Sequence, residues 1–169
     1  MKALTATTVI LLILLVMRLD VVAQTKAERP GPEPSANLSP TEVVEMQLSA
    51  LADNDNPLPN NGIAVVFRFA SPSNREATGP LDRFTMMVKG APYRDMLNHR
   101  QAEIMPAMES PSHTIVPVRL VTRDGKEARY VFVLTQQQAG TCEGCWMTDA
   151  VMPVDGDIQD SARPDAETI

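Results

Sequence analysis

The sequence predicts an α+β domain in which N-terminal helices pack on a four-stranded antiparallel sheet. Within residues 38–97, apolar side chains recur three and four positions apart, which is the spacing of helices with one buried face. Residues 102–153 instead contain four short runs rich in valine and other strand-forming residues. Because the helices come first and the strands follow in one block, the order is that of an α+β architecture.

The first helix is expected to begin at a capping box. Ser39, Pro40 and Glu42 supply a capping hydroxyl, a proline at the first helical position and a carboxylate that can reach back to the cap. Apolar residues then recur on one face as far as Leu51. The prolines and asparagines of residues 53–61 must end this helix.

Three further helical segments are expected before the sheet. Residues 62–70 are apolar on every side except at Arg68, which predicts a short, deeply buried helix. The Ser-Pro-Ser-Asn sequence at residues 71–74 is expected to stop it. Residues 80–88 form the third helical candidate, and residues 93–97 could add one further turn.

Four strands are expected, at residues 102–108, 114–122, 128–136 and 145–153. The Asp-Gly pair within residues 123–126 predicts a hairpin between the second and third strands, because this pair tolerates the positive φ that such a turn requires.

Both faces of the central strands are expected to be apolar. Val116, Val118 and Leu120 alternate with Ile115, Pro117, Arg119 and Val121, and Tyr130, Phe132 and Leu134 alternate with Val131 and Val133. Helices can cover one of these faces. The other face then needs a partner subunit, another layer or a bound ligand.

The two ends of the chain are expected to lie outside the domain. Lys2, the apolar run at residues 9–17 and a small-residue site ending at Ala23 have the three parts of a secretory signal peptide, so residues 1–23 predict export. If this segment is not cleaved, it would tether the protein to the membrane. Residues 24–37 are proline-rich and predict a disordered linker, and residues 154–169 predict a disordered acidic tail. The domain itself should span residues 38–153.

Composition excludes some classes of partner. The formal net charge is −6, and no basic stripe with interleaved aromatic residues is present, so nucleic-acid binding is not expected. No second apolar run is long enough to span a bilayer, so no stable membrane span is expected after cleavage.

Several segments resemble a known family. They are residues 62–72 (GIAVVFRFASP), 78–84 (TGPLDRF), 96–100 (MLNHR) and 145–149 (CWMTD), and together they are similar to family DUF4864 of domains of unknown function. The resemblance covers roughly residues 38–153. It implies a nuclear transport factor 2-like fold, in which helices close a strongly curved antiparallel sheet into a cone with an open end. That superfamily contains isomerases, dehydratases and simple binding or dimerisation modules, so it implies no catalytic residue here.

Cys142 and Cys145 are the only cysteines, and they allow several interpretations. A structural disulfide is favoured, because the expected compartment is oxidising and Glu143-Gly144 supplies a turn that brings the two residues within bridging range. A thioredoxin-type pair normally opens a helix, whereas a strand is expected to follow here. A zinc site would need two further ligands at suitable spacing, and neither His99 nor His113 has it. A reduced pair is the remaining alternative.

Five residues are candidates for lining a ligand site: Arg68, Tyr93, His99, Trp146 and Asp149. A buried arginine needs a carboxylate, so Arg68 is expected to pair with Asp149 or Glu103, or else to bind an anionic ligand. Asp149 in an apolar cone could act as a general base, although a turn cap or salt bridge is the plainer interpretation. His99 and Trp146 could equally have structural roles, as a hydrogen-bonded histidine and a core or interface tryptophan.

These observations favour an exported module that binds a small apolar molecule or forms a homodimer through its sheet. The alternative is a small cofactor-independent enzyme of isomerase or dehydratase type that uses the same cavity. No metal and no cofactor are expected. A cavity with two convergent ionisable groups would favour the enzyme.

Overall fold

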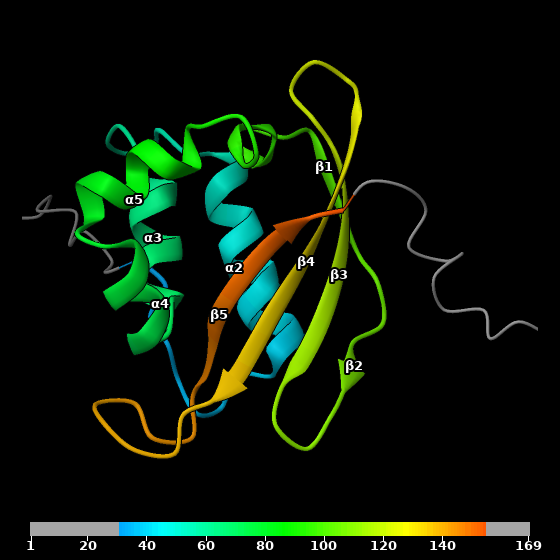
Figure 1. The fold of residues 1–169 in the computed structure, drawn as a ribbon. Helices are drawn as coiled ribbons and strands as arrows, with labels where there is room; N and C mark the ends of the chain where they lie inside the picture. Colours follow the sequence, from blue (N-terminus) through cyan, green and yellow to red (C-terminus); the bar gives the residue numbers. More distant parts are fainter. Residues whose placement is uncertain (1–30, 155–169) are drawn as a thin grey trace, which may run out of the picture. The chain divides into compact units, whose positions relative to one another are not determined.

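The computed structural model describes residues 31–154, which form four α-helices, one 3₁₀ turn and five strands (Figure 1). The predicted signal peptide at residues 1–23, the first half of the predicted linker and the acidic tail beyond residue 154 lie outside the described residues. Residues 31–37 contain no helix or strand. The helices are α2 (Pro40–Ala52), α3 (Asn61–Phe69), α4 (Pro72–Thr78) and α5 (Leu81–Val88), followed by η1 (Arg94–Met96). The strands are β1 (Gln101–Ile104), β2 (Met108–Glu109), β3 (Thr114–Val121), β4 (Glu127–Gln136) and β5 (Trp146–Pro153).

Helix α2 begins as its sequence predicts. The Ser39 hydroxyl accepts a hydrogen bond from the Glu42 amide at 3.3 Å, and the Glu42 carboxylate accepts one from the Ser39 amide at 2.8 Å. The Ser39 hydroxyl also donates to the Glu42 carboxylate at 2.7 Å. The bond from the Ser39 amide first, and then the bond from the Ser39 hydroxyl, hold the pKa of the Glu42 carboxyl below its ordinary value. The capping box is therefore confirmed.

The segment between α3 and α5 differs from the prediction. Residues 71–74 end α3, but they also begin a further helix, α4. The Ser71 hydroxyl accepts a hydrogen bond from the Asn74 amide at 3.2 Å, and Pro72 occupies the start of the helix. Ser-Pro is thus a helix start here for the same reason as at Ser39-Pro40.

The sheet is antiparallel and open, with the order β1-β3-β4-β5 and with β2 also paired to β3. The prediction of four strands was wrong, because the segment expected at residues 102–108 is split into β1 and β2. Pro106 lies in the interruption, and proline has no N–H to donate to a ladder. The predicted hairpin is confirmed, and Gly125 in its turn has φ +81°.

All the helices lie on one side of the sheet (Figure 1). On that side β3 and β4 bury Val116, Val118, Leu120, Tyr130, Phe132 and Leu134, which pack against α2, α3 and α5 in one core. The alternate residues, including Ile115, Val131 and Val133, belong to the opposite face, which no helix covers. The predicted division into two apolar faces is confirmed.

Helices α2 and α3 approach each other closely where α3 begins. Asn54 follows α2, and its carbonyl and side-chain oxygens accept hydrogen bonds from the amides of Gly62 and Ile63 at 2.9 and 3.1 Å. A Cβ atom on Gly62 would lie only 2.1 Å from the carbonyl oxygen of Ala50. Glycine is therefore required at position 62 for contact with a neighbouring backbone.

Within residues 31–154, no helix has the length and apolar character needed to cross a membrane.

Candidate functional site

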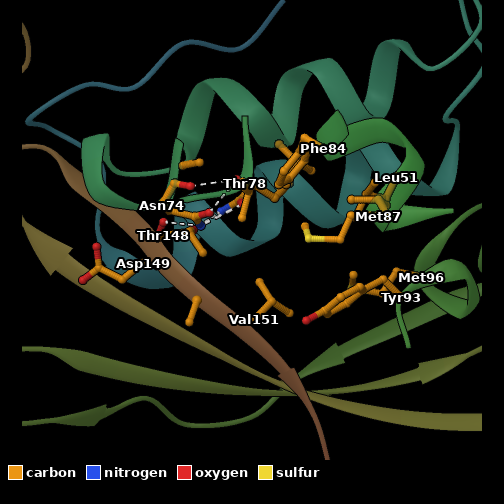
Figure 2. Close-up of a pocket in the computed structure, with 15 residues that line it drawn as sticks. Leu51, Asn74, Thr78, Phe84, Met87, Tyr93, Met96, Thr148, Asp149 and Val151 are labelled. Carbon is orange, nitrogen blue, oxygen red and sulfur yellow. Dashed lines mark hydrogen bonds between the residues drawn. The ribbon is translucent and has the colours of Figure 1, made fainter. Parts of the chain in front are cut away.

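A cavity of about 170 Å³ lies between the helices and strand β5 (Figure 2). β5 is an edge strand of the sheet, so its outer edge is not covered by another strand. Only its beginning is engaged there: Ala70 forms an isolated parallel bridge with Thr148, and the Ser71 amide donates to the Thr148 carbonyl at 2.9 Å. The cavity is lined by Gln47, Leu51, Val66, Ala70, Asn74, Thr78, Phe84, Met87, Val88, Tyr93, Met96, Thr148, Asp149, Ala150 and Val151.

Most of the cavity wall is apolar. In Figure 2, Leu51, Phe84 and Met87 extend from the helices, and Val151 approaches from β5. Leu51 and Phe84 are buried, whereas Met87 and Val151 are half-buried. The half-buried residues place part of the wall within reach of solvent.

The end of the cavity nearest α4 is polar, and its side chains hold one another in place. The Asn74 amide nitrogen donates to the Thr148 carbonyl at 3.0 Å, and the Thr78 hydroxyl donates to the Asn74 carbonyl at 2.7 Å. Gln47, which is fully buried, donates from its amide nitrogen to the Thr148 hydroxyl at 2.9 Å. A buried polar group that already has partners keeps a defined orientation, so this end is preorganised.

Two of the predicted site residues line the cavity, and they do not converge. Tyr93 enters it from the segment just before η1, with its hydroxyl directed toward Val151 in Figure 2. Asp149 lies beside Thr148, but its carboxylate points away from Tyr93. Tyr93 and Asp149 are the ionisable side chains of the described lining.

The other three predicted site residues lie elsewhere. The Arg68 guanidinium pairs with Glu33 at 3.0 Å, so the expected pairing with Asp149 or Glu103 was wrong; Glu103 pairs with Arg119. His99 is buried, and its Nδ1 atom is 2.8 Å from the carbonyl oxygen of Met96.

Trp146 is half-buried and packs against the main core, and it is not among the cavity residues. Tertiary folding thus brings Tyr93 and Asp149 to one cavity and leaves Arg68, His99 and Trp146 outside it.

Tyr130 does not line the cavity, but it contacts the segment that carries Tyr93. Its hydroxyl donates to the Pro92 carbonyl at 3.2 Å, which holds the backbone next to Tyr93 against the sheet. Burial raises the pKa of Tyr130 to about 12, and electrostatic interaction first with Asp95 and then with Tyr93 acts in the same direction. The hydroxyl therefore stays protonated, and able to donate, over the whole physiological range.

Sequence reasoning missed the polar end of the cavity. Gln47 could have been noticed, because it falls on the same helical face as Val44, Leu48 and Leu51, where a polar side chain is unusual. No local pattern marks Asn74, Thr78 or Thr148, because their meeting depends on how α4 packs on β5.

Cys142 and Cys145 form a disulfide, with their Cα atoms 5.5 Å apart. The loop that it closes is short, so the chain-entropy contribution to stability is only about 2 kcal/mol. Among residues 31–154, no cluster of three histidine, cysteine, aspartate or glutamate side chains could hold a metal ion.

The fold and the cavity define a small α+β domain with an apolar pocket between its helices and the edge of an open antiparallel sheet. The family described as Domain of unknown function (DUF4864) matches residues 35–155, and the chain belongs to this family.

One solved structure is similar over most of its length. It is the solution structure of RPA3114, a SEC-C motif containing protein from Rhodopseudomonas palustris, with 16% sequence identity and a TM-score of 0.46. The similarity covers 72% of this chain and 82% of that chain. Among curated proteins, none matches the sequence.

Proposed function

We propose that the protein is an exported module of the nuclear transport factor 2-like superfamily that binds a small, largely apolar molecule in the cavity beside β5. The observation that carries this proposal is an apolar space with a preorganised polar end, opening along an unpaired strand edge. Apolar pockets with a few fixed polar groups are the usual form of small-molecule sites.

The volume of the cavity limits the size of the ligand. Engineered protein cavities of roughly 150 Å³ bind benzene, and drug-sized ligands occupy roughly 300–1,000 Å³. A cavity of about 170 Å³ therefore fits a single aromatic ring or a short alkyl chain. Burying ~150 Å² of such a ligand would contribute about 4 kcal/mol, which corresponds to a Kd near 1 mM before any polar contact is counted.

Polar contacts can raise the affinity at both ends of the cavity. An asparagine amide has two N–H donors, and the hydrogen bond from Asn74 to Thr148 uses one of them. Within residues 31–154 the Tyr93 hydroxyl makes no hydrogen bond, and it faces the cavity. The preferred ligand thus has an apolar body and one hydrogen-bonding group, as a phenol does.

The placement of the ionisable groups favours binding over catalysis. General acid–base chemistry needs two groups within reach of one reacting atom. Tyr93 and Asp149 diverge, and the polar groups at the far end of the cavity are uncharged amides and hydroxyls.

The experiment is thermal unfolding of the full chain with para-cresol as the probe. At ten times its Kd, a ligand that binds only the native state adds about 1.4 kcal/mol, which raises the Tm by roughly 3–5 °C for a domain of this size. Val151→Phe should abolish the shift by filling the cavity. Met86→Phe places the same ring at a position of α5 that is 70% exposed, outside the cavity, and it should leave the shift intact.

Three results bear on the proposal. Loss of the shift in Val151→Phe alone supports it. No shift with para-cresol, toluene or indole in the wild-type protein contradicts it. Equal loss in Val151→Phe and Met86→Phe also contradicts it, because the probe then binds somewhere other than the cavity.

A second candidate function is homodimerisation through the sheet face that carries no helix. Pro117, Val131 and Val133 lie on this face, and Met108 and Met152 at its borders are 48% and 47% exposed. Stable dimers bury roughly 800 Å² per partner, mostly apolar at the centre. Light scattering should give the mass of a dimer, and Val131→Asp should give the monomer with an unchanged far-ultraviolet spectrum. A wild-type monomer at millimolar concentration would eliminate this candidate.

Export is proposed from residues 1–23, and the disulfide is compatible with an oxidising compartment.

A further inference from the structure

A second pocket lies beside the disulfide, apart from the cavity described above. It has a volume of about 240 Å³ and is lined by Glu33, Pro34, Arg68, Arg75, Thr141, Cys142 and Met147. Figure 1 shows the loop between β4 and β5 at the same end of the domain as α4 and the segment that precedes α2. Three segments that are distant in sequence therefore meet at Cys142.

The two cysteines differ in accessibility. Cys145 is fully buried, whereas Cys142 is half-buried and lines the pocket. A reagent that enters the pocket therefore contacts Cys142 and not Cys145. An accessible cysteine three positions before a buried one suits thiol–disulfide exchange, because the buried sulfur can act as leaving group and later as resolving thiol.

Backbone hydrogen bonds hold the cysteine turn without help from the sulfur atoms. The Gly144 amide donates to the Gln137 carbonyl at 2.8 Å, and the Gln137 amide donates to the Cys145 carbonyl at 2.9 Å. The Gln136 side chain adds a bond to the Gly144 carbonyl at 3.1 Å. Breaking the disulfide leaves these bonds in place, so the two cysteines stay close enough to re-form it.

The charges around Cys142 favour an anion. Arg68 pairs with Glu33 through one nitrogen, but its Nε atom is buried without a hydrogen-bond partner. Arg75 is half-buried and makes no ion pair with any residue of the described part of the chain. Glu143, the neighbour of Cys142, is exposed and does not line the pocket. Two guanidinium groups thus face one carboxylate in a chain whose net charge is −6.

We propose that Cys142 and Cys145 are a redox-active pair that exchanges with small thiols and disulfides carrying a carboxylate or another anionic group. The arginines attract such a molecule into the pocket and stabilise a thiolate at Cys142. This pocket shares no lining residue with the apolar cavity, so a test of the redox pair does not depend on the function proposed above.

The exchange balances in two steps. A small thiolate attacks the sulfur of Cys142, the bond between Cys142 and Cys145 breaks, and Cys145 leaves with the electron pair and takes a proton from water. A second thiolate attacks the small molecule's sulfur in the mixed disulfide, and Cys142 leaves as a thiolate. Two thiols are thereby oxidised to one disulfide and the protein pair is reduced by two electrons; a small disulfide drives the reverse reaction.

The experiment compares two thiols of equal length with the oxidised full chain under native conditions. They are 2-mercaptoethanesulfonate, an anion, and cysteamine, a cation, used at equal thiolate concentration, with reduction followed by alkylation and mass spectrometry. The anion should react about five-fold faster. Arg75→Gln should reduce this preference, Glu33→Gln should increase it, and Arg83→Gln on the exposed side of α5 should not change it.

Single-cysteine variants locate the reacting sulfur. With the disulfide of 2-mercaptoethanesulfonate, Cys145→Ser should form a mixed disulfide at Cys142 about ten-fold faster than Cys142→Ser forms one at Cys145. In urea the two rates should become similar. Equal rates in the native protein, no reduction without denaturant, or no preference for the anionic thiol would each overturn the proposal and leave a purely structural disulfide.

Discussion

Replacing Gly62 with alanine should destabilise the protein, although alanine is the better helix former. Gly62 is the second residue of α3, and its φ is not in the left-handed region, so the backbone itself accepts alanine. In an unobstructed helix interior the substitution would gain up to about 1 kcal/mol. Here the added Cβ would lie 2.1 Å from the Ala50 carbonyl oxygen and 2.9 Å from the Asn54 Cα atom.

The size of the effect follows from these distances. Ordinary contact begins near 3.4 Å, so the start of α3 must move away from α2 by more than an ångström. Both obstructing atoms belong to the backbone and cannot rotate aside. Overpacking costs about 1–3 kcal/mol, and weakening the hydrogen bonds from Gly62 and Ile63 to Asn54 adds roughly 1 kcal/mol for each. We expect a total of about 3–5 kcal/mol, against a typical domain stability of 5–15 kcal/mol.

Urea unfolding of the full chain, followed by far-ultraviolet circular dichroism, measures this loss. Ala64→Gly, two residues further along the same helix, is the matched control and should lose only about 1 kcal/mol through helix propensity. A Gly62→Ala midpoint at or above that of the wild type would refute the close-approach reasoning.

The remaining predictions concern titration and capping. The pKa of Tyr130 is raised from 10.0 in the unfolded chain to about 12. The resulting stability is complete below pH 10 and is lost as the pH rises toward 12, by about 2–3 kcal/mol in all. In Tyr130→Phe, urea midpoints measured between pH 10 and 12 should lack this part of the decline; an unchanged decline would contradict the assignment. In urea unfolding at neutral pH, Ser39→Ala should lower the free energy of unfolding by about 1 kcal/mol, because it removes the cap of α2. Ser49 is exposed within the same helix, and Ser49→Ala should not lower the free energy of unfolding.

Local sequence predicted the features whose local signal has a single meaning. The capping box at Ser39, the Asp-Gly hairpin and the alternation of β3 and β4 depend on residues a few positions apart, and each is present. Where local reasoning was wrong, one signal had two meanings: Ser71-Pro72 both ends a helix and begins the next, and Pro106 divides a run that otherwise resembles one strand.

The candidate sites were decided by tertiary structure. Gln47 and Thr148 form a hydrogen bond although they are 101 positions apart in sequence. Arg68 pairs with Glu33 and not with either of the carboxylates expected from sequence, Asp149 and Glu103. An ion pair or a polar cavity wall depends on which surfaces pack together. The type of a residue does not indicate which distant residue will lie next to it. Sequence by itself therefore determined the order of helices before strands, the start of α2, the hairpin between β3 and β4, and the apolar faces of these two strands. Only packing decided which polar side chains face the cavity and which charges surround Cys142, because those contacts join residues of different elements that are distant in sequence.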